Sequence, residues 1–189
     1  MQESGKGQAV ALRAMCEDDL AAVWAVQAAC YPPPMQEAAA LLLARLRAAP
    51  STALVGCVGG AVRAYLFAYP SLLGRVTPLG APFVPAPAPD ALYLHDLAVA
   101  PGAHGIGLAR RLAARLLAEA AASGLGHAAL VSVQDSRRFW EGLGFMEDGG
   151  RARCAALATY PGHAVYMTRS LAGLAPHPAE PVGPALSPN

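Results

Sequence analysis

The sequence predicts a single α/β domain, because of its length and of two alternating periodicities. With 189 residues, the chain can bury one apolar core without disulfides or a structural metal, but two full domains would be cramped. Short apolar segments typical of strands alternate with segments whose apolar residues recur every three or four positions, as in helices. Since Arg, Gly or Pro interrupts each apolar run well before about 18 residues, we expect no transmembrane helix.

The first half of the chain predicts three strands and two helices. Acidic residues at 17–19 favour a helix start, and Pro32-Pro33-Pro34 ends that helix. Gly59-Gly60 between two strand-like segments indicates a hairpin turn. The expected elements are a strand at 10–13, helices at 17–29 and 35–48, and strands at 52–58 and 61–68.

Residues 70–90 form a proline-rich connection between two predicted strands. A loop of this length in a compact domain is more often functional or mobile than inert. Its place before a central strand favours a flap on the substrate side, with a flexible insertion of no function as an equal alternative.

The second half predicts a buried strand followed by an amphipathic helix. The helix carries Leu112, Leu116 and Leu117 on one side and arginines on the other. The expected elements are strands at 91–99, 127–133, 145–154 and 163–168, and helices at 105–122 and 136–143. We place the folded domain at residues 9–171 and expect residues 1–8 and the proline-rich tail at 172–189 to be disordered.

The composition excludes several classes of protein. A formal net charge of +1 gives no electrostatic case for nucleic acid or an anionic membrane as the main partner. The N-terminus is polar and lacks the apolar segment of a secretion signal, which predicts a cytoplasmic protein. We expect no metal site or disulfide, because no C-x-x-C pair or histidine at ligand spacing accompanies the cysteines, which we interpret as small buried residues: Cys16, Cys30, Cys57 and Cys154.

A glycine-rich loop lies between the strand at 91–99 and the helix that follows it. Gly105 and Gly107 let backbone N–H groups approach an anion, and the helix start adds its positive dipole end, so a pyrophosphate can bind without lysine. The alternative is a tight turn that simply needs glycine. A dinucleotide-dependent redox enzyme fits poorly, because Arg110 stands where the third glycine of a Rossmann loop would lie.

Two motifs resemble those of the GNAT acetyltransferases. VAPGAHGIGLA, residues 99–109, is similar to the family's coenzyme A loop V-x-P-x-x-[RQ]-G-x-G-x-[GA], with His104 in place of Arg or Gln. SRRFWEGLGF, residues 136–145, is similar to the segment A-x-x-[FL]-Y-E-x-x-G-F, with Ser136 in place of Ala and Trp140 in place of Tyr. The resemblance covers about residues 10–170. It implies a mixed, mostly antiparallel sheet of six to seven strands flanked by helices, with a splay between the two central strands.

The resemblance also implies acetyl-CoA as cosubstrate and a site for it. The strand end at Leu97, Ala98 and Val99 would pair its backbone with the pantetheine arm. The loop would hold the pyrophosphate with His104, Gly105, Ile106, Gly107, Leu108 and Ala109. Ser136 and Phe139, from the second motif, complete the expected coenzyme site.

The strand LYLHDLAV resembles the H-x-H-A-L-A-V strand of the arylalkylamine (serotonin) N-acetyltransferase branch, with Tyr93 at the first histidine and His95 at the second. In that branch the histidines act through water to deprotonate the substrate amine, and an ammonium ion does need a base before it can attack a thioester. His95 is therefore the expected base, with a satisfied core histidine as the alternative. Tyr93 shares its side of the strand, and the two-residue period places Asp96 on the opposite face, as a buried carboxylate or a helper to another loop.

With Trp140 in the sequence, the identity of the group that protonates the departing thiolate is undecided. Many relatives have a tyrosine there, and an indole cannot replace it. Either the thiolate leaves unassisted, or Tyr160 or Tyr166 protonates it, or catalysis is weak.

The expected function is acetyl transfer from acetyl-CoA to the primary amine of a small molecule or peptide, with a homodimer left open. The alternative is a catalytically weak acetyl-CoA-binding regulatory module, which the missing tyrosine favours.

Overall fold

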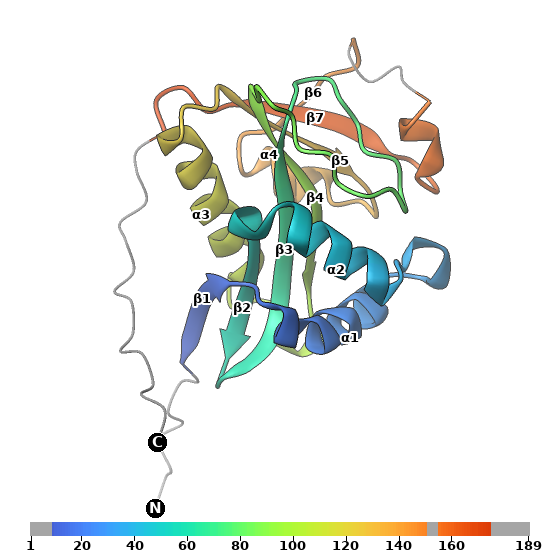
Figure 1. Cartoon of the computed structure of the whole chain (residues 1–189), viewed down its shortest axis with the longest axis vertical. Coiled ribbons are helices and arrows are strands. Elements are labelled where there is room, and N and C mark those ends of the chain that lie inside the picture. Colours follow the sequence, from blue (N-terminus) through green and yellow to red (C-terminus); the bar gives the residue numbers. More distant parts are fainter. Residues whose placement is uncertain (1–8, 151–154, 175–189) are drawn as a thin grey trace, which may run out of the picture.

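The computed structural model describes residues 9–150 and 155–174, and within them seven strands form one mixed sheet (Figure 1). The strand order is β1-β2-β3-β4-β5-β7-β6, and only β4 and β5 pair in parallel. This confirms the predicted fold class. The strands are β1 (Val10–Ala14), β2 (Ala53–Val58), β3 (Ala61–Ser71), β4 (Ala91–Val99), β5 (His127–Ser132), β6 (Met146–Glu147) and β7 (Val165–Ser170).

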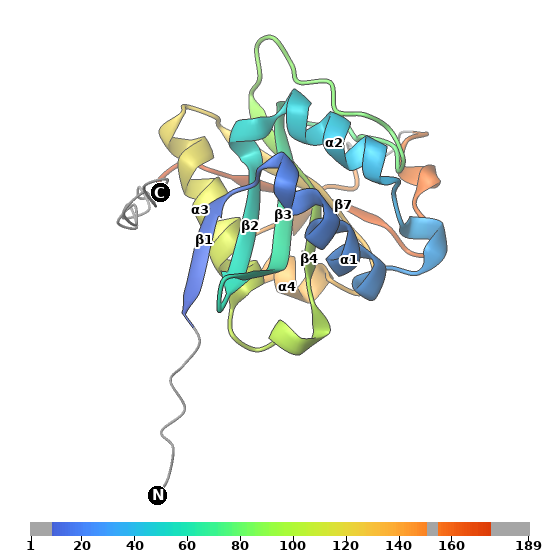
Figure 2. The same cartoon turned by 60° about the horizontal axis from the view of Figure 1, so that its bottom comes forward.

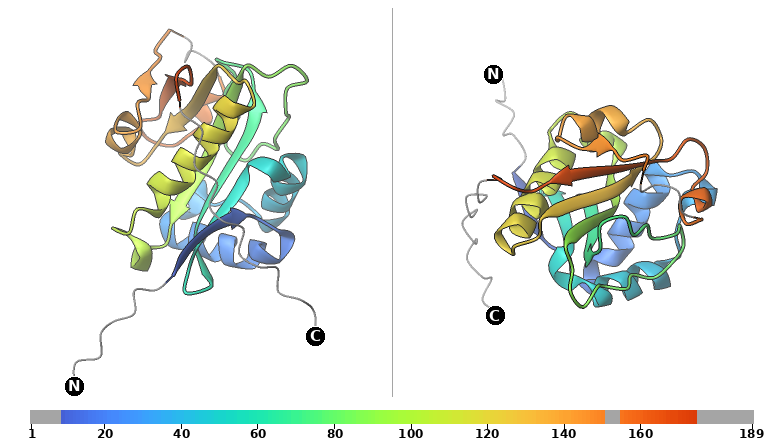
Figure 3. Two further views of the ribbon diagram at one scale, coloured as in Figure 1. Left: turned by 90° about the vertical axis from the view of Figure 1, so that its left-hand side faces the viewer. Right: turned by 90° about the horizontal axis from the view of Figure 1, so that it is seen from above.

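Helices cover both faces of the sheet, as Figure 3 shows in its left-hand view. The α-helices are α1 (Leu20–Cys30), α2 (Ala39–Ala48), α3 (Leu108–Ala122) and α4 (Arg137–Glu141). Short 3₁₀ turns are η1 (Glu17–Asp19), η2 (Pro33–Met35), η3 (Pro50–Thr52), η4 (Pro101–Ala103) and η5 (Leu157–Thr159). One apolar core lies between the sheet and α3, and a second, richer in aromatic side chains, lies between the sheet and α1 and α2. Each sheet face is therefore buried, as the apolar strand sequences require.

Most predicted elements appear within a few residues of their expected bounds, and three differ. The second helix begins at Ala39 rather than at residue 35, because the backbone N–H of Glu37 donates to Oε1 of Gln27 at 2.7 Å and the chain there is not helical. The helix expected at 136–143 is only Arg137–Glu141. The strand expected at 145–154 is two residues long, and residues 151–154 lie outside the described residues.

The two central strands, β4 and β5, stop pairing about half-way along β4. Their parallel pairing ends at Leu94 and Leu130, whereas β4 runs on to Val99 and β5 runs on to Ser132, still paired with β7 on its other side. This opening between β4 and β5 is the splay that the family resemblance implied.

The proline-rich connection, which begins after Ser71, packs against the domain. It runs beside α2 in Figure 2 and buries Val76, Phe83 and Ala86. The Arg45 side chain of α2 donates to the carbonyl of Ala81, and the N–H of Leu79 donates to Thr159 Oγ1 at 2.9 Å. The loop is therefore an ordered wall of the domain in this structure.

The expectations for the cysteines, the two termini and membrane-spanning helices can be compared with the described part of the structure. Cys57 is buried, Cys30 is half-buried and Cys16 is exposed, so the expectation of buried cysteines is wrong for Cys16. Cys154, the N-terminal residues 1–8 and most of the expected tail lie outside the described residues. Within the described part of the chain, no helix is long and apolar enough to cross a membrane.

Candidate active site

A cavity of about 180 Å³ occupies the opening between β4 and β5. Because the two strands no longer pair there, the β5-facing edge of β4 beyond Leu94 is left without a neighbouring strand. The wall combines the end of β4, the start of α3 and the segment from β5 into α4. Its residues include Tyr31, Leu94, His95, Asp96, Leu97, Val99, Ala109, Gln134, Ser136, Phe139 and Trp140.

A β-bulge at His95 decides which side chains reach this cavity. Phe67 of β3 pairs with Asp96 and Ala68 pairs with Leu94, so His95 has no partner on β3. An extra residue in one strand shifts the alternation of side chains by one position. As a result, His95 and Asp96 both turn towards α1 and α2, and the expectation that Asp96 faces the opposite side from His95 is wrong.

Asp96 lies between two tyrosine hydroxyls. Tyr31, directly after α1, donates to Oδ1 at 2.7 Å, and Tyr65 of β3 donates to Oδ2 at 2.7 Å. Burial raises the pKa of Asp96, and the two tyrosine hydrogen bonds oppose that rise. Burial, followed by the nearby Asp96 charge, raises the pKa of both tyrosines, so their hydroxyls remain donors.

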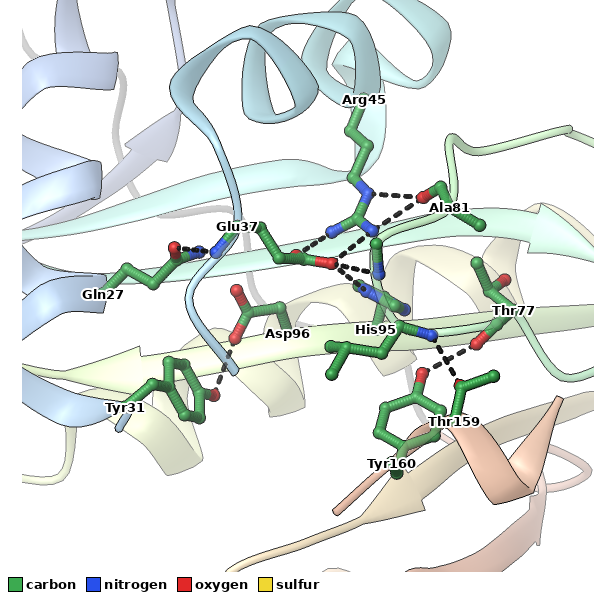
Figure 4. Close-up of polar contacts among 12 residues, drawn as sticks. Gln27, Tyr31, Glu37, Arg45, Thr77, Ala81, His95, Asp96, Thr159 and Tyr160 are labelled. Carbon is green, nitrogen blue, oxygen red and sulfur yellow. Dashed lines mark hydrogen bonds and ion pairs between the residues drawn. The ribbon is translucent and has the colours of Figure 1, made fainter. Parts of the chain in front are cut away.

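His95 belongs to a buried polar network that begins at Glu37 (Figure 4). Its side chain is 2% exposed, and its Nε2 lies 3.7 Å from Oε1 of Glu37. Glu37 is in turn held by the guanidinium of Arg45, in a paired ion contact, and by the N–H of Gly80 at 2.9 Å. The Phe83 ring and the imidazole pack in a T-shaped arrangement, with ring centroids 5.3 Å apart.

The network sets the charge of its members. Burial alone would raise the pKa of Glu37, but the contacts with His95 and Arg45 outweigh it and lower that pKa to about 2. Burial lowers the pKa of His95, and the Glu37 carboxylate partly offsets this effect. His95 is therefore neutral near pH 7, with one buried ring nitrogen, Nδ1, lacking a hydrogen-bond partner in the described structure. A neutral imidazole can accept a proton.

A second, smaller cavity of about 30 Å³ is lined by His95 and by the segment between α1 and α2, and it shares part of its wall with the first. Its volume is enough for about one water molecule. Met35, Leu79, Val131, Val133 and Tyr160 supply apolar and aromatic surface, and the shared wall residues are Tyr31, His95, Asp96, Val131 and Val133. His95 and Asp96 thus stand between two adjoining spaces.

The glycine-rich connection after β4 has the backbone that the sequence predicted. Gly105 and Gly107 have φ values of +83° and +79°, which L-residues with a side chain rarely adopt. A Cβ on either glycine would meet no atom within 4 Å, so the space before them is open. Gly107 precedes α3, whose first N–H groups have no acceptor within the helix. Leu108 anchors the helix in the core, while the neighbouring Ile106 is 46% exposed.

His104 contacts the end of β4 through its ring. Its Nε2 lies 2.9 Å from the carbonyl oxygen of Val99, which can only accept, so this nitrogen carries the proton. The neutral ring can then offer only an acceptor, Nδ1, to any anion at the loop. Protonation would turn Nδ1 into a donor.

The segment after β5 forms the opposite wall of the first cavity. Gln134 and Asp135 adopt left-handed backbone conformations, with φ of 51° and 57°, although neither is glycine. Such strain is often found at functional sites. Ser136 contacts Ser132 through the two hydroxyls at 3.0 Å, and the Phe139 ring packs edge-on against Trp140 with centroids 4.9 Å apart.

Three tyrosines considered from the sequence occupy different positions. Tyr160 lines the second cavity and donates to the carbonyl of Thr77 at 2.7 Å. Tyr166 is buried and its hydroxyl accepts from the N–H of Gly74 at 2.8 Å. Tyr93 lies on the same face as His95, as expected, with ring centroids 6.1 Å apart, but it does not line either cavity.

The comparisons with known proteins agree with this geometry. The sequence model of the Acetyltransferase (GNAT) family matches residues 19–145, which is more than half of the chain. The chain belongs to the GNAT acetyltransferase family. The search of curated proteins gives no match.

Several solved structures share the GNAT fold with this chain. The loading GNATL domain of CurA from Lyngbya majuscula has a TM-score of 0.73 and 14% identity over 86% of this chain and 98% of that one. The GphF GNAT-like decarboxylase, in complex with isobutyryl-CoA, has a TM-score of 0.67 and 20% identity over 85% and 99%. The ribosomal-protein-S18-alanine N-acetyltransferase from Escherichia coli has a TM-score of 0.63 and 15% identity over 92% and 99%. At these identities the similarity establishes the fold.

The most connected residues of this GNAT site were not singled out in the sequence. Glu37 and Tyr31 stand in an irregular segment between α1 and α2, where no periodicity marks them. Arg45 gave one usable signal, because it shares the buried face of α2 with Leu42 and Leu46, where an arginine is out of place. The narrower resemblance to the arylalkylamine branch rests on the β4 sequence alone.

Proposed function

We propose that this protein transfers the acetyl group of acetyl-CoA to a primary amine. The observation that carries the proposal is the parting of β4 from β5, which opens a cavity at the point where the bulge brings His95 and Asp96 together. Members of the GNAT family are acyltransferases, and the family match covers all of these residues.

The residues present suit the donor. The unpaired edge at Leu97, Ala98 and Val99 offers backbone groups to the pantetheine arm, and the open space before Gly105 and Gly107 suits the pyrophosphate. Ser136 and Phe139 lie on the facing wall of the same cavity. The thioester would then lie near His95 and Asp96, with Trp140 packed behind it.

His95 is the base in this proposal. An acceptor ammonium gives one proton to the neutral imidazole, directly or through a water, and its nitrogen gains a lone pair. The nitrogen then forms a bond to the thioester carbonyl carbon, and the carbon–sulfur bond breaks with its electrons on sulfur. The second proton of the nitrogen neutralises the thiolate through solvent or a side chain, so the products are an amide, free coenzyme A and one released proton.

Of the two tyrosines that the sequence offered as proton donors to the leaving thiolate, Tyr160 lines a cavity; Tyr31 lines both cavities, but its hydroxyl donates to Asp96. Trp140 cannot protonate sulfur, and the Tyr166 hydroxyl lies away from both cavities. Tyr160 lines the second cavity, although burial raises its pKa and its proton is directed to the carbonyl of Thr77. We therefore propose that the thiolate leaves with little assistance, which its ordinary pKa of about 8.5 for a thiol permits.

The second candidate function is a weakly catalytic module that binds acetyl-CoA and reports its level to a partner. Trp140, buried in the cavity wall where many family members have a tyrosine, favours it.

Turnover and binding separate the two functions. Release of thiol from acetyl-CoA is measured against a panel of primary amines and peptides, and acetyl-CoA binding is measured by calorimetry. Thiol release that depends on the amine supports the enzyme. Tight binding with no amine-dependent release supports the module, and absence of binding contradicts both.

A further inference from the structure

Among the described residues, the walls around His95 carry two carboxylates and no free cation. Asp96 and Glu37 both line the second cavity, and no arginine or lysine is among its lining residues. Asp96 has only neutral hydrogen-bond donors, the hydroxyls of Tyr31 and Tyr65. Burial favours the protonated form of Asp96, and an ammonium that entered beside it would favour the carboxylate again.

Arg45 is the nearby cation, and it is fully engaged. Its side chain is buried, and its Nη1 and Nη2 donate to the two oxygens of Glu37. Its Nε and Nη2 donate to the carbonyl of Ala81 at 3.1 and 2.7 Å. The guanidinium also lies over the Phe83 ring, at 4.9 Å from the centroid. An anionic ligand beside His95 would therefore find Arg45 already neutralised by Glu37.

We propose that the acceptor site selects ammonium groups that have no neighbouring carboxylate, and thus takes amines in preference to free amino acids. This inference rests on the proposed function, because it names the class of acceptor for the same site. Asp96 attracts the ammonium into the second cavity, whose room for about one water molecule suits an ammonium group, and Met35, Leu79, Val131, Val133 and Tyr160 give the cavity an apolar border.

The discrimination has a physical cause. The carboxylate of an amino acid is bonded to the carbon that carries the ammonium, so both groups must enter together. Its charge would lose water where the nearby guanidinium of Arg45 is already paired with Glu37, and it would lie beside the carboxylate of Asp96, whose like charge repels it. A neutral amide at the same place has nearly the same bulk and none of this charge.

Matched compounds test the proposal on the wild-type protein. One set is phenethylamine, phenylalaninamide and phenylalanine, and a second is 3-methylbutylamine, leucinamide and leucine. At the plateau of each pH profile, we expect kcat/KM for the free amino acid to be at least about 100-fold below that of its amide. Equal rates for the amino acid and its amide would overturn the proposal. Equal losses for both, relative to the plain amine, would also overturn it, because bulk and not charge would then be the cause.

A binding measurement keeps this inference separate from the proposed function. If no compound is acetylated, the proposed function fails, and calorimetric binding of the same compounds to the coenzyme A complex still tests the charge selection. Binding of the amides at least about tenfold tighter than that of the amino acids supports selection by charge, whereas equal affinities contradict it.

A variant pair assigns the effect to Asp96. Asp96→Asn should reduce the ratio between amide and amino acid at least about tenfold, while Asp18→Asn, at an exposed carboxylate in η1, should leave the ratio unchanged. A folded Asp96→Asn protein with the wild-type ratio would contradict the role of Asp96. If this variant does not fold, the wild-type comparison decides the proposal.

Discussion

Glu37 and His95 meet inside the domain, with Oε1 of the carboxylate 3.7 Å from Nε2 of the imidazole and both side chains buried. The same carboxylate accepts from the N–H of Gly80 and pairs with Arg45 (Figure 4). Glu37 therefore contacts both the candidate base, His95, and the proline-rich segment between β3 and β4. The negative charge of Glu37 raises the pKa of His95, whereas the positive charge of Arg45 lowers it.

Glu37→Gln should lower the pKa of His95 and slow the reaction. The Glu37 carboxylate raises the pKa of His95, whereas burial and the Arg45 charge lower it, so removing the carboxylate leaves the lowering effects, opposed only by Asp96. His95 would remain neutral to lower pH, and the acidic limb of the kcat/KM profile should move to lower pH by the same amount. We also expect a lower plateau, because a less basic imidazole is a weaker proton acceptor.

The measurement is an NMR titration of the His95 imidazole beside the kcat/KM profile. Glu17→Gln is the control, because Glu17 forms an exposed ion pair with Arg47 away from the site. An imidazole titration that does not move in a folded Glu37→Gln protein would show that the two side chains are not coupled.

His95→Ala should lower kcat/KM at least about tenfold and spare coenzyme binding, since general-base contributions are about 10²- to 10⁴-fold. Part of the loss should return at high pH, where more of the amine is already neutral. His163→Ala, at an exposed histidine, is the control. If His95→Ala keeps the wild-type rate while Asp96→Asn is inactive, Asp96 is the base, a possibility that their shared position beside the cavity makes concrete.

Gly107→Asp should abolish the thermal stabilisation by acetyl-CoA. The aspartate would put bulk and negative charge into the open space where we place the pyrophosphate, and a ligand stabilises the native state only as far as it binds. Gly60→Asp is a matched control, because Gly60 has a φ of +83° against +79° for Gly107 and lies in the turn between β2 and β3. Both variants should bear a similar backbone cost of about 1–2 kcal/mol. A normal coenzyme response in folded Gly107→Asp would place the pyrophosphate elsewhere.

Arg45→Met should destabilise the protein by about 3–5 kcal/mol, because it leaves the Glu37 carboxylate buried without its cation. Unfolding in urea measures the loss. Arg47→Met, two positions along the same helix, removes only an exposed ion pair and should have little effect. Similar losses in the two variants would mean that Glu37 finds another partner or becomes protonated.

The sequence determined the segments whose structure depends on near neighbours. The order of strand, Pro-Gly turn, glycine loop and helix around Val99 to Leu112 is local, so β4 and α3 appear where expected and both loop glycines have positive φ. The glycine loop and the two elements that flank it could therefore be predicted from residues that are adjacent in the chain.

The tertiary structure decided the acceptor side. The bulge at His95 arises from the register with β3. It places Asp96 on the same face as His95, whereas strict alternation would place the two on opposite faces. Glu37 and Gly80 are 43 residues apart in the sequence. Arg45 is only eight residues from Glu37 but lies inside α2, whereas Glu37 precedes that helix, so both contacts of Glu37 depend on how separate segments pack. A two-residue period describes an isolated strand, but a one-residue shift against its neighbour reverses every later side chain, and only the paired strands fix that shift.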